Sequence, residues 1–240
     1  MLANVYLHYV LDLWFREQVQ RRNRGKSRLF RFADDFVAGF EYRHEAAAFE
    51  QALKQRLAQY GLEVAPEKTK TIRFGRNGGP HNGRFDFLGF EFRWEPDRKG
   101  RPTVKRRTAR KKLQGAVHRM GEWLRTNRHR KIPELMKTLA AKLRGHGNYY
   151  GVIGNSLSLA QYYEQTTQLL YKWLNRRSQK RSYTWKALNR LMERYETPRP
   201  KVVEKSGAKM TESCRLVWKV GQTLAQGLYG QHYRPASALR

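Results

Sequence analysis

The sequence is poor in cysteine and has no long apolar run. Cys214 is the only cysteine among the 240 residues, so an internal disulfide and a cysteine-based zinc cluster are both excluded. The seven histidines include no HExxH-like pair. The most apolar early stretch, LANVYLHYVLDLWF, is too short for a membrane span and is interrupted by His8 and Asp12. It also lacks the pattern of a secretory signal, so we expect a cytoplasmic protein with no membrane partner.

Acidic residues are scarce, whereas basic residues are abundant. Lys and Arg number 49 against 20 Asp and Glu, which gives a formal net charge of +29. This excess predicts attraction to polyanions, usually nucleic acid, through phosphate contacts and counterion release. An anionic membrane surface is the alternative polyanion. A hydrophobic share of 40% argues against wholesale disorder, and the length allows one large or two small domains.

The hydrophobic pattern changes near residue 97. Up to about residue 96 it predicts an α+β region with short strands on either side of the acidic pair at 34–35. Beyond that point come a basic segment and then helical periodicity, and the tail 204–240 stays unassigned. The elements predicted before residue 97 are a helix over 2–21, strands within 28–40, a helix over 43–61, a strand–turn–strand over 62–74, a loop over 77–83 and one strand over 84–94. Those predicted after it are helices over 108–127, 132–144, 155–178 and 184–195.

Two adjacent carboxylates, Asp34 and Asp35, lie inside the apolar stretch RLFRFADDFVAGF. Neighbouring carboxylates at a strand turn suit Mg²⁺, which takes oxygen ligands and commonly binds a substrate phosphate beside one or two carboxylates. The simple alternative is a solvated hairpin turn, because Asp favours turns. The apolar flanks argue against that alternative. A carboxylate metal site on a very basic chain is what a nucleic-acid polymerase or nuclease needs.

Five segments carry a resemblance to a known family. In chain order they are LANVYLHYVLD, FRFADDFVAGF, YGLEVAPEKTK, FDFLGFEF and KLRGHGNYYGVIGN. Together they resemble the C-terminal half of a group II intron reverse transcriptase, also called a maturase, over residues 2–203. The resemblance implies a partial right-hand polymerase palm (antiparallel strands with a helix) over 1–96. It implies an α-helical thumb, the maturase or X domain, over 97–203.

The same resemblance implies the chemistry and part of its site. The family is an RNA-directed DNA polymerase of mobile introns, in which a primer 3′-hydroxyl attacks the α-phosphate of a dNTP. FADD resembles the YADD box, so Asp34 and Asp35 would be catalytic carboxylates that bind metal in a two-Mg²⁺ site. Phe32 stands where a tyrosine is usual, near the nucleic acid. Within PEKT, Lys68 would face the triphosphate, or is an exposed turn lysine. Within FLGF, Gly89 would belong to a primer grip, or to a bulge.

The thumb-like part supplies candidate residues for nucleic-acid binding. Tyr149 and Tyr150 would stack on bases, or pack internally beside the neighbouring glycines. A cluster of cations crowds the predicted helix start, where it opposes the helix dipole. A phosphate backbone would offset that cost, and an ordinary solvated face is the plain alternative. The clustered cations are Arg106, Arg107, Arg110, Lys111 and Lys112.

A catalytic element expected of the family is missing. Complete relatives carry another catalytic aspartate on a separate strand before this segment, and neither Asp12 nor Asp86 is placed to replace it. The palm sheet would also lack a central strand and expose a bare edge. We therefore expect an N-terminally truncated form, or one half of a split enzyme with a separately encoded N-terminal half. Such a chain would polymerise weakly or not at all.

Three functions compete at this point. The first is a reverse transcriptase and maturase that extends a DNA primer on an RNA template with dNTPs. The second is an RNA-binding module that assists splicing of structured intron RNA without polymerising. The third is a basic scaffold protein of another family. A bacterial, cytoplasmic, nucleic-acid-associated protein fits the first two.

Overall fold

The computed structural model describes residues 2–75, 83–97, 99–179, 182–204 and 216–220, the last as backbone. The chain forms two compact units and has the expected α+β character. The first unit comprises Met1–Leu88, Arg93–Val104 and Met210–Arg240, and the second comprises Gly89–Phe92 and Lys105–Lys209. Within the described residues, every helix is too short or too polar to cross a membrane.

The first unit begins with a helical run that matches the predicted helix over 2–21, although parts of it are π-helical. The next helix, α3, ends in a Schellman motif around Gly61, whose φ of +66° is ordinary only for glycine. The Leu62 N–H donates to the Leu57 carbonyl at 2.9 Å, and the Gly61 N–H donates to Ala58 at 3.1 Å. These helices are α1 (Leu2–Leu7), η1 (His8–Leu13), η2 (Phe15–Val19), α2 (Gln20–Arg22) and α3 (Arg43–Gln59).

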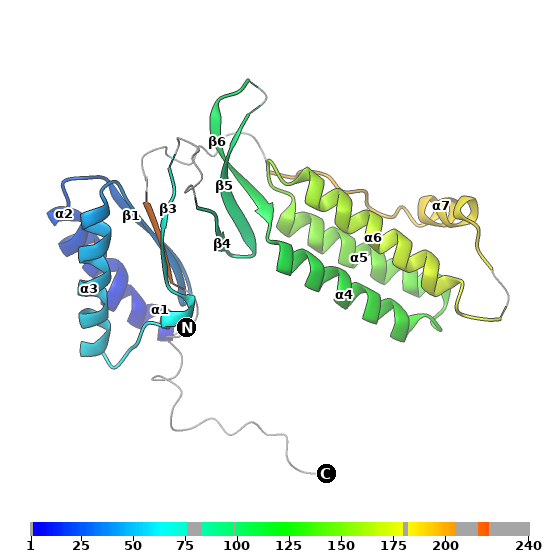
Figure 1. The fold of residues 1–240 in the computed structure, drawn as a ribbon. Coiled ribbons are helices and arrows are strands. Elements are labelled where there is room, and N and C mark those ends of the chain that lie inside the picture. The colour runs from blue at the N-terminus through cyan, green and yellow to red at the C-terminus, as the bar shows by residue number, and fades with distance from the viewer. Residues whose placement is uncertain (1, 76–82, 98, 180–181, 205–215, 221–240) are drawn as a thin grey trace, which may run out of the picture. The chain divides into compact units, whose positions relative to one another are not determined.

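The sheet of the first unit is antiparallel in the order β1-β2-β7-β3. Its last strand in sequence, β7, pairs with β2 on one side and β3 on the other (orange in Figure 1). The expectation of a bare edge beside β2 is therefore wrong, because a segment of the unassigned tail fills that position. The strands are β1 (Ser27–Phe32), β2 (Asp35–Phe40), β3 (Lys70–Arg73) and β7 (Leu216–Val220).

Strand β2 lies at the centre of the first core. Its residues from Phe36 to Phe40 are all buried, as expected of a central strand covered on both faces. Phe40 packs against Phe49 of α3 with ring centroids 5.0 Å apart, and Phe15 of the N-terminal helical run lies 5.4 Å from the same Phe49 ring. This packing gives the acidic pair at the start of β2 a rigid support.

A second sheet joins β4 (Phe85–Phe87), β5 (Phe90–Pro96) and β6 (Pro102–Thr108). The prediction of one strand over 84–94 is wrong. Leu88 and Gly89, with φ of 50° and 79°, form a two-residue turn between β4 and β5. The sequence also gave no sign of β6, and the boundary expected near residue 97 falls inside the β5–β6 connection.

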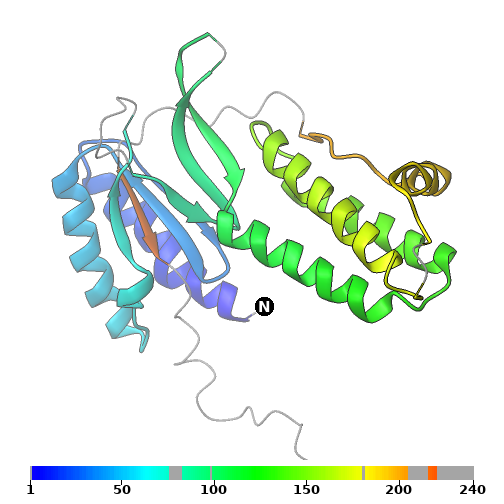
Figure 2. The same ribbon diagram turned by 45° about the vertical axis from the view of Figure 1, so that its right-hand side comes forward.

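The second unit is mainly helical. Helices α4, α5 and α6 run side by side (Figure 2). They match the predicted helices except that α4 begins at Arg110, α5 continues to Tyr150 and α6 already ends at Leu174. Their apolar faces meet in one core, which includes Leu124, Leu139, Leu170 and Leu188, all at most 1% exposed. The helices are α4 (Arg110–Asn127), α5 (Ile132–Tyr150), α6 (Ser156–Leu174) and α7 (Trp185–Arg194).

Candidate catalytic hairpin and nucleic-acid interface

The acidic pair lies at the tip of the β1–β2 hairpin. Phe32 pairs with Asp35 across it, and the turn consists of Ala33 and Asp34. Ala33 has a φ of 54°, in the left-handed region that favours glycine, so the turn is held in a costly conformation. Both carboxylates are half-buried, whereas the Phe32 ring is 65% exposed. The hairpin thus presents two carboxylates and an aromatic ring beyond a fully buried strand.

Arg31 fixes the shape of this turn. Its Nη1 donates to the Ala33 carbonyl at 2.8 Å. Its Nε and Nη2 donate to the two carboxylate oxygens of Asp12, each at 2.7 Å. Because such bidentate pairs are among the stronger side-chain interactions, Asp12 is engaged in holding Arg31. Both carboxylate oxygens of Asp12 are therefore occupied by Arg31 rather than turned to the hairpin carboxylates.

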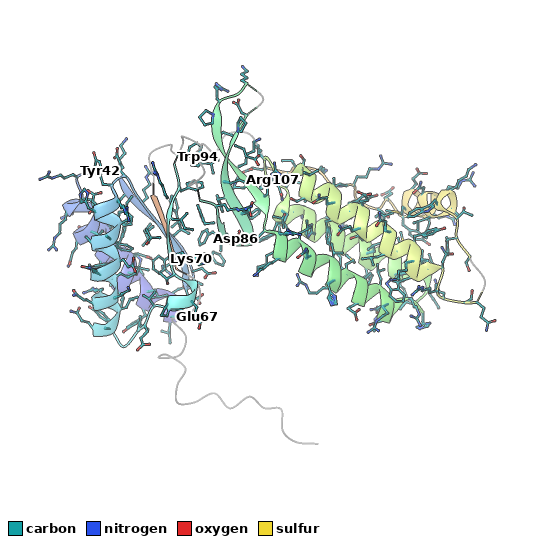
Figure 3. All side chains as sticks on the ribbon, in the orientation of Figure 1. Tyr42, Glu67, Lys70, Asp86, Trp94 and Arg107 are labelled. Atoms are coloured by element: carbon teal, nitrogen blue, oxygen red, sulfur yellow. The ribbon has the colours of Figure 1, made fainter. Side chains whose placement is uncertain are left out.

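The hairpin carboxylates have few acidic neighbours. Within the described ranges, no three residues of the His, Cys, Asp and Glu types gather in a way that could hold a metal ion. Strand β7, which pairs with β2, has the sequence LVWKV and carries no acid. Asp86 is exposed on β4, where Figure 3 labels it. Asp34 and Asp35 therefore offer a two-carboxylate set.

Lys68 belongs to the short 3₁₀ helix Pro66–Lys68, directly before β3. Its backbone position is defined, but its side chain lies outside the described residues. Figure 3 labels its neighbours Glu67 and Lys70, both of which are exposed. The assignment of Lys68 to a triphosphate stays a prediction.

The backbone of Gly89 lies close to the side chain of Tyr150. A Cβ at this position would lie 2.9 Å from the Tyr150 hydroxyl, and the Gly89 carbonyl accepts from the Ala109 N–H at 2.9 Å. Phe90 packs edge-on against Tyr150 at 5.2 Å and stacks on Tyr149 at 5.9 Å. Burial raises the pKa of Tyr150. The structure thus brings Gly89 together with Tyr149 and Tyr150, and it shows a tight turn where a bulge was the alternative to a primer grip.

Tyr149 and Tyr150 differ in what they offer to a ligand. Tyr149 is 55% exposed, whereas Tyr150 is half-buried beneath Phe90 and His146. Tyr149 therefore keeps accessible aromatic surface, and Tyr150 mainly packs.

The five predicted cations do not share a helix start. Arg106 and Arg107 lie on β6, so placing them at the beginning of a helix is wrong (Figure 3 labels Arg107). Arg106 Nη2 donates to both carboxylate oxygens of Glu204, at 2.7 and 2.6 Å. This hydrogen bond, together with one from the Ile153 N–H, holds the pKa of Glu204 below its ordinary value.

The other three cations do occupy the first turn of α4. Arg110, Lys111 and Lys112 are exposed there. Ala109 precedes them and offers no side-chain cap, and the first turn carries no acid. A helix amino terminus with this composition attracts anions and repels its own side chains.

Several structurally important partners could not be found from the sequence. Arg31 and Asp12 are 19 positions apart, and Arg106 and Glu204 are 98 apart. Nothing in the local pattern around either acid marks it as a partner. Only the folded chain shows that these two arginines are neutralised.

Comparison with known families follows the same division of the chain. Residues 1–92 match the family described as reverse transcriptase (RNA-dependent DNA polymerase). Residues 113–192 match the group II intron, maturase-specific domain. A search of curated proteins finds no match. The two matched ranges cover more than two-thirds of the sequence and agree with the α+β hairpin region and the helical bundle. This chain belongs to the group II intron reverse transcriptase and maturase family.

Proposed function

We propose that this chain binds structured intron RNA, chiefly through its helical unit, and polymerises little or not at all. One observation carries the proposal. The position beside the Asp35-bearing strand β2 is filled by β7, whose five residues include no acid. The acidic hairpin is retained, but the neighbouring strand adds no carboxylate to it.

The hairpin suits one magnesium ion better than two. Asp34 and Asp35 would hold the ion together with substrate phosphate oxygens, which is a common arrangement for Mg²⁺. A bound ion would neutralise phosphate charge and polarise an attacking hydroxyl. A two-ion site needs further ligands, and the described part of the chain offers no larger acidic group. Lys68 is proposed to contact the triphosphate.

The RNA-binding surface is proposed to centre on Arg110, Lys111 and Lys112. Their exposed charges at an uncapped helix start would gain most from a phosphate backbone. Exposed aromatic rings at Phe32 and Tyr149 would stack on unpaired bases. Gly89 and Tyr150 would support Tyr149 through Phe90. Arg107 is proposed as a further phosphate contact, and Arg106 as a weaker one because Glu204 neutralises it.

The second candidate function is RNA-directed DNA polymerisation. The match of residues 1–92 to the reverse transcriptase family and the retained Asp34–Asp35 hairpin favour it. It would use an RNA template, a DNA primer and dNTPs, and would release pyrophosphate. A second protein chain would be the partner that supplies another carboxylate.

Mg²⁺-dependent primer extension on an RNA template separates the two functions. We expect no extension from the chain or from its Asp34→Ala variant, while both bind a structured RNA at moderate salt. Extension that Asp34→Ala abolishes would show that the chain assembles a working site, and would replace the first proposal by the second. Absence of RNA binding would contradict both.

A further inference from the structure

A second group of cations lies at the opposite end of α4 from Arg110. Three of them surround the ring of Trp173, with their charged groups 5.3 to 5.7 Å from its centroid. Three more lie next to them in sequence. We name the whole group the Trp173 cluster. It consists of Trp173 with Arg128, Arg130, Lys131, Lys172, Arg176 and Arg177.

The ends of three helices build this cluster. Helix α4 ends at Asn127, α5 begins at Ile132 and α6 ends at Leu174. The Arg177 guanidinium donates to the Arg130 carbonyl at 3.1 Å and so ties the α4–α5 connection to the end of α6. The cations therefore gather at one end of the bundle, although they come from two separate stretches of sequence.

No acid balances these charges from within the two stretches. Residues 123–133 and 170–182 contain neither Asp nor Glu, and the acids that flank the first stretch are Glu122 and, in the first turn of α5, Glu134. Arg125 pairs with Glu122, at 2.9 Å, and is left out of the cluster for that reason. Like charges held this close repel one another, so the arrangement costs stability unless an anion binds.

Helix dipoles account for only part of the cluster. Lys172 lies in the last turn of α6 and Arg176 just beyond it, where cations are favourable. Arg130 and Lys131 precede the amino terminus of α5, where cations are unfavourable, and Lys131 provides no side-chain cap. Local stability therefore does not explain why these two residues are cations.

Two buried nitrogen atoms of the cluster have no hydrogen-bond acceptor among the described residues. They are Nε1 of Trp173 and Nε of Arg128. Such donors are normally satisfied in a folded protein, and because both atoms are closed to solvent, an outside acceptor would reach them only after the two side chains shift. Phosphate oxygens are acceptors of the right charge for this setting.

We propose that the Trp173 cluster is a second site for the RNA phosphate backbone, in addition to Arg110–Lys112. This inference rests on the proposed RNA binding. At about 1.5 Å of rise per residue, the first turn of α4 and Arg128 lie about 25 Å apart along the helix. Two cationic anchors with this spacing suit an extended polyanion rather than a free phosphate.

An anionic membrane is the less suitable partner. Peripheral membrane surfaces combine cations with exposed aromatic or aliphatic side chains that enter the lipid. No large apolar residue within 123–133 or 170–179 of the described chain is exposed. Trp185, which stacks on Tyr171 beside the cluster, is exposed, but a single ring is a weak lipid anchor, so the charge pattern favours nucleic acid.

The test compares two four-site variants of the full chain with equal net charge. The first is Arg130→Gln, Lys131→Gln, Lys172→Gln and Arg176→Gln, all at exposed positions of the cluster. The control is Lys137→Gln, Lys186→Gln, Arg190→Gln and Arg194→Gln, which are exposed positions of α5 and α7 outside it. Affinity for a labelled RNA hairpin is measured across a series of KCl concentrations.

We expect the cluster variant to bind about 10- to 100-fold more weakly at moderate salt, with a log Kd against log salt slope smaller by about three. The control should change affinity by no more than about threefold, because its charges contact no phosphate. Equal weakening in both variants would overturn the proposal. Failure of the unsubstituted chain to bind RNA would instead contradict the proposed function itself.

Two further measurements test the proposal independently of the RNA affinities. Acetylation of Lys131 and Lys172 in the unsubstituted chain should fall when the RNA hairpin is bound, and this readout does not depend on how a variant folds. Unchanged acetylation would contradict the proposed RNA contact at the Trp173 cluster.

Vesicles containing phosphatidylserine provide the membrane comparison. If the cluster variant lost vesicle binding but kept RNA binding, the cluster would be a membrane surface and the proposal would be wrong.

Discussion

The two units of this protein differ in where their elements find partners. In the second unit α4, α5, α6 and α7 follow one another in sequence and share one core. In the first unit, β2 and β3 are joined through β7, which lies about 140 residues beyond β3 in the chain. A bundle of consecutive helices needs little loop closure, whereas the sheet depends on bringing a distant segment back. We therefore expect the helical unit to be the more independent of the two.

Removing β7 should have the largest effect on this contrast. Deletion of residues 216–220 would leave β2 and β3 without their shared partner and expose two strand edges. The amides of β2 that bond to β7 should lose most of their hydrogen-exchange protection, whereas the alternate amides still bond to β1. The protein should also aggregate more readily. Amides in α4–α6 should exchange as before.

Deletion of residues 221–240 is the matched control, because it shortens the chain but keeps β7. It should leave β2 protected. If β2 stayed equally protected without β7, the sheet would not depend on the distant strand, and the contrast between the units would fail.

The sequence predicted the helices well for a physical reason. A helix such as α6 repeats its apolar residues every three or four positions over 19 residues, and that signal is entirely local. β7 has five residues, LVWKV, without clean alternation, and what makes it a strand is its pairing with β2 and β3. Non-local pairing leaves little trace in the segment itself.

The site shows the same division. The FADD hairpin was predictable because two acids between apolar strands are conspicuous in the sequence. The β4–β5 turn was missed because its first residue is Leu88. Leucine rarely adopts a positive φ, so its presence did not indicate the turn in which its φ is 50°. The neutralisation of Arg106 by Glu204 was missed because the two residues are 98 positions apart. Local chemistry was predictable, and long-range partners were not.

Within the helical unit, Asn155 makes long-range hydrogen bonds, and we expect their loss to lower the stability of the unit. Its fully buried amide accepts from the Thr108 N–H at 2.8 Å and donates to Thr108 Oγ1 at 2.9 Å and to the Tyr150 carbonyl at 2.8 Å. Asn155→Ala would leave these groups unsatisfied and should destabilise the second unit by about 2–4 kcal/mol. Urea unfolding followed by helical circular dichroism measures this. Asn148→Ala, at an exposed position of α5, should change stability by less than about 0.5 kcal/mol, and equal effects would contradict the role of the buried amide.

Acid should weaken the helical unit through His146. Burial lowers the pKa of this imidazole to about 4, and its ring stacks on Tyr162 with centroids 3.6 Å apart. Because the unfolded chain takes up the proton more readily, stability is fully present above about pH 6.5 and is lost as pH falls toward 4. The ring keeps some solvent exposure, so we expect a loss of no more than about 2 kcal/mol.

The pH effect is checked with unfolding curves at pH 7, 5.5 and 4.5. His146→Phe retains an aromatic ring for Tyr162 but cannot titrate, so the difference between the two proteins should shrink or reverse as pH falls. A constant difference at all three values would show that His146 does not carry the acid sensitivity.

The smallest expected effect compares two turn residues with positive φ. Gly89→Ala should cost about 1–2 kcal/mol, because φ is 79° and the new Cβ would meet the Tyr150 hydroxyl at 2.9 Å. In a Tyr150→Phe background the steric part of this destabilisation should disappear, while about 1 kcal/mol of backbone strain remains.

Ala33→Gly in the first unit should have the opposite effect and stabilise the protein by up to about 1 kcal/mol, because Ala33 already has a φ of 54°. Thermal unfolding of the four variants measures both signs. A stabilising Gly89→Ala would show that the turn relaxes, whereas a destabilising Ala33→Gly would show that the Ala33 methyl supports the acidic hairpin.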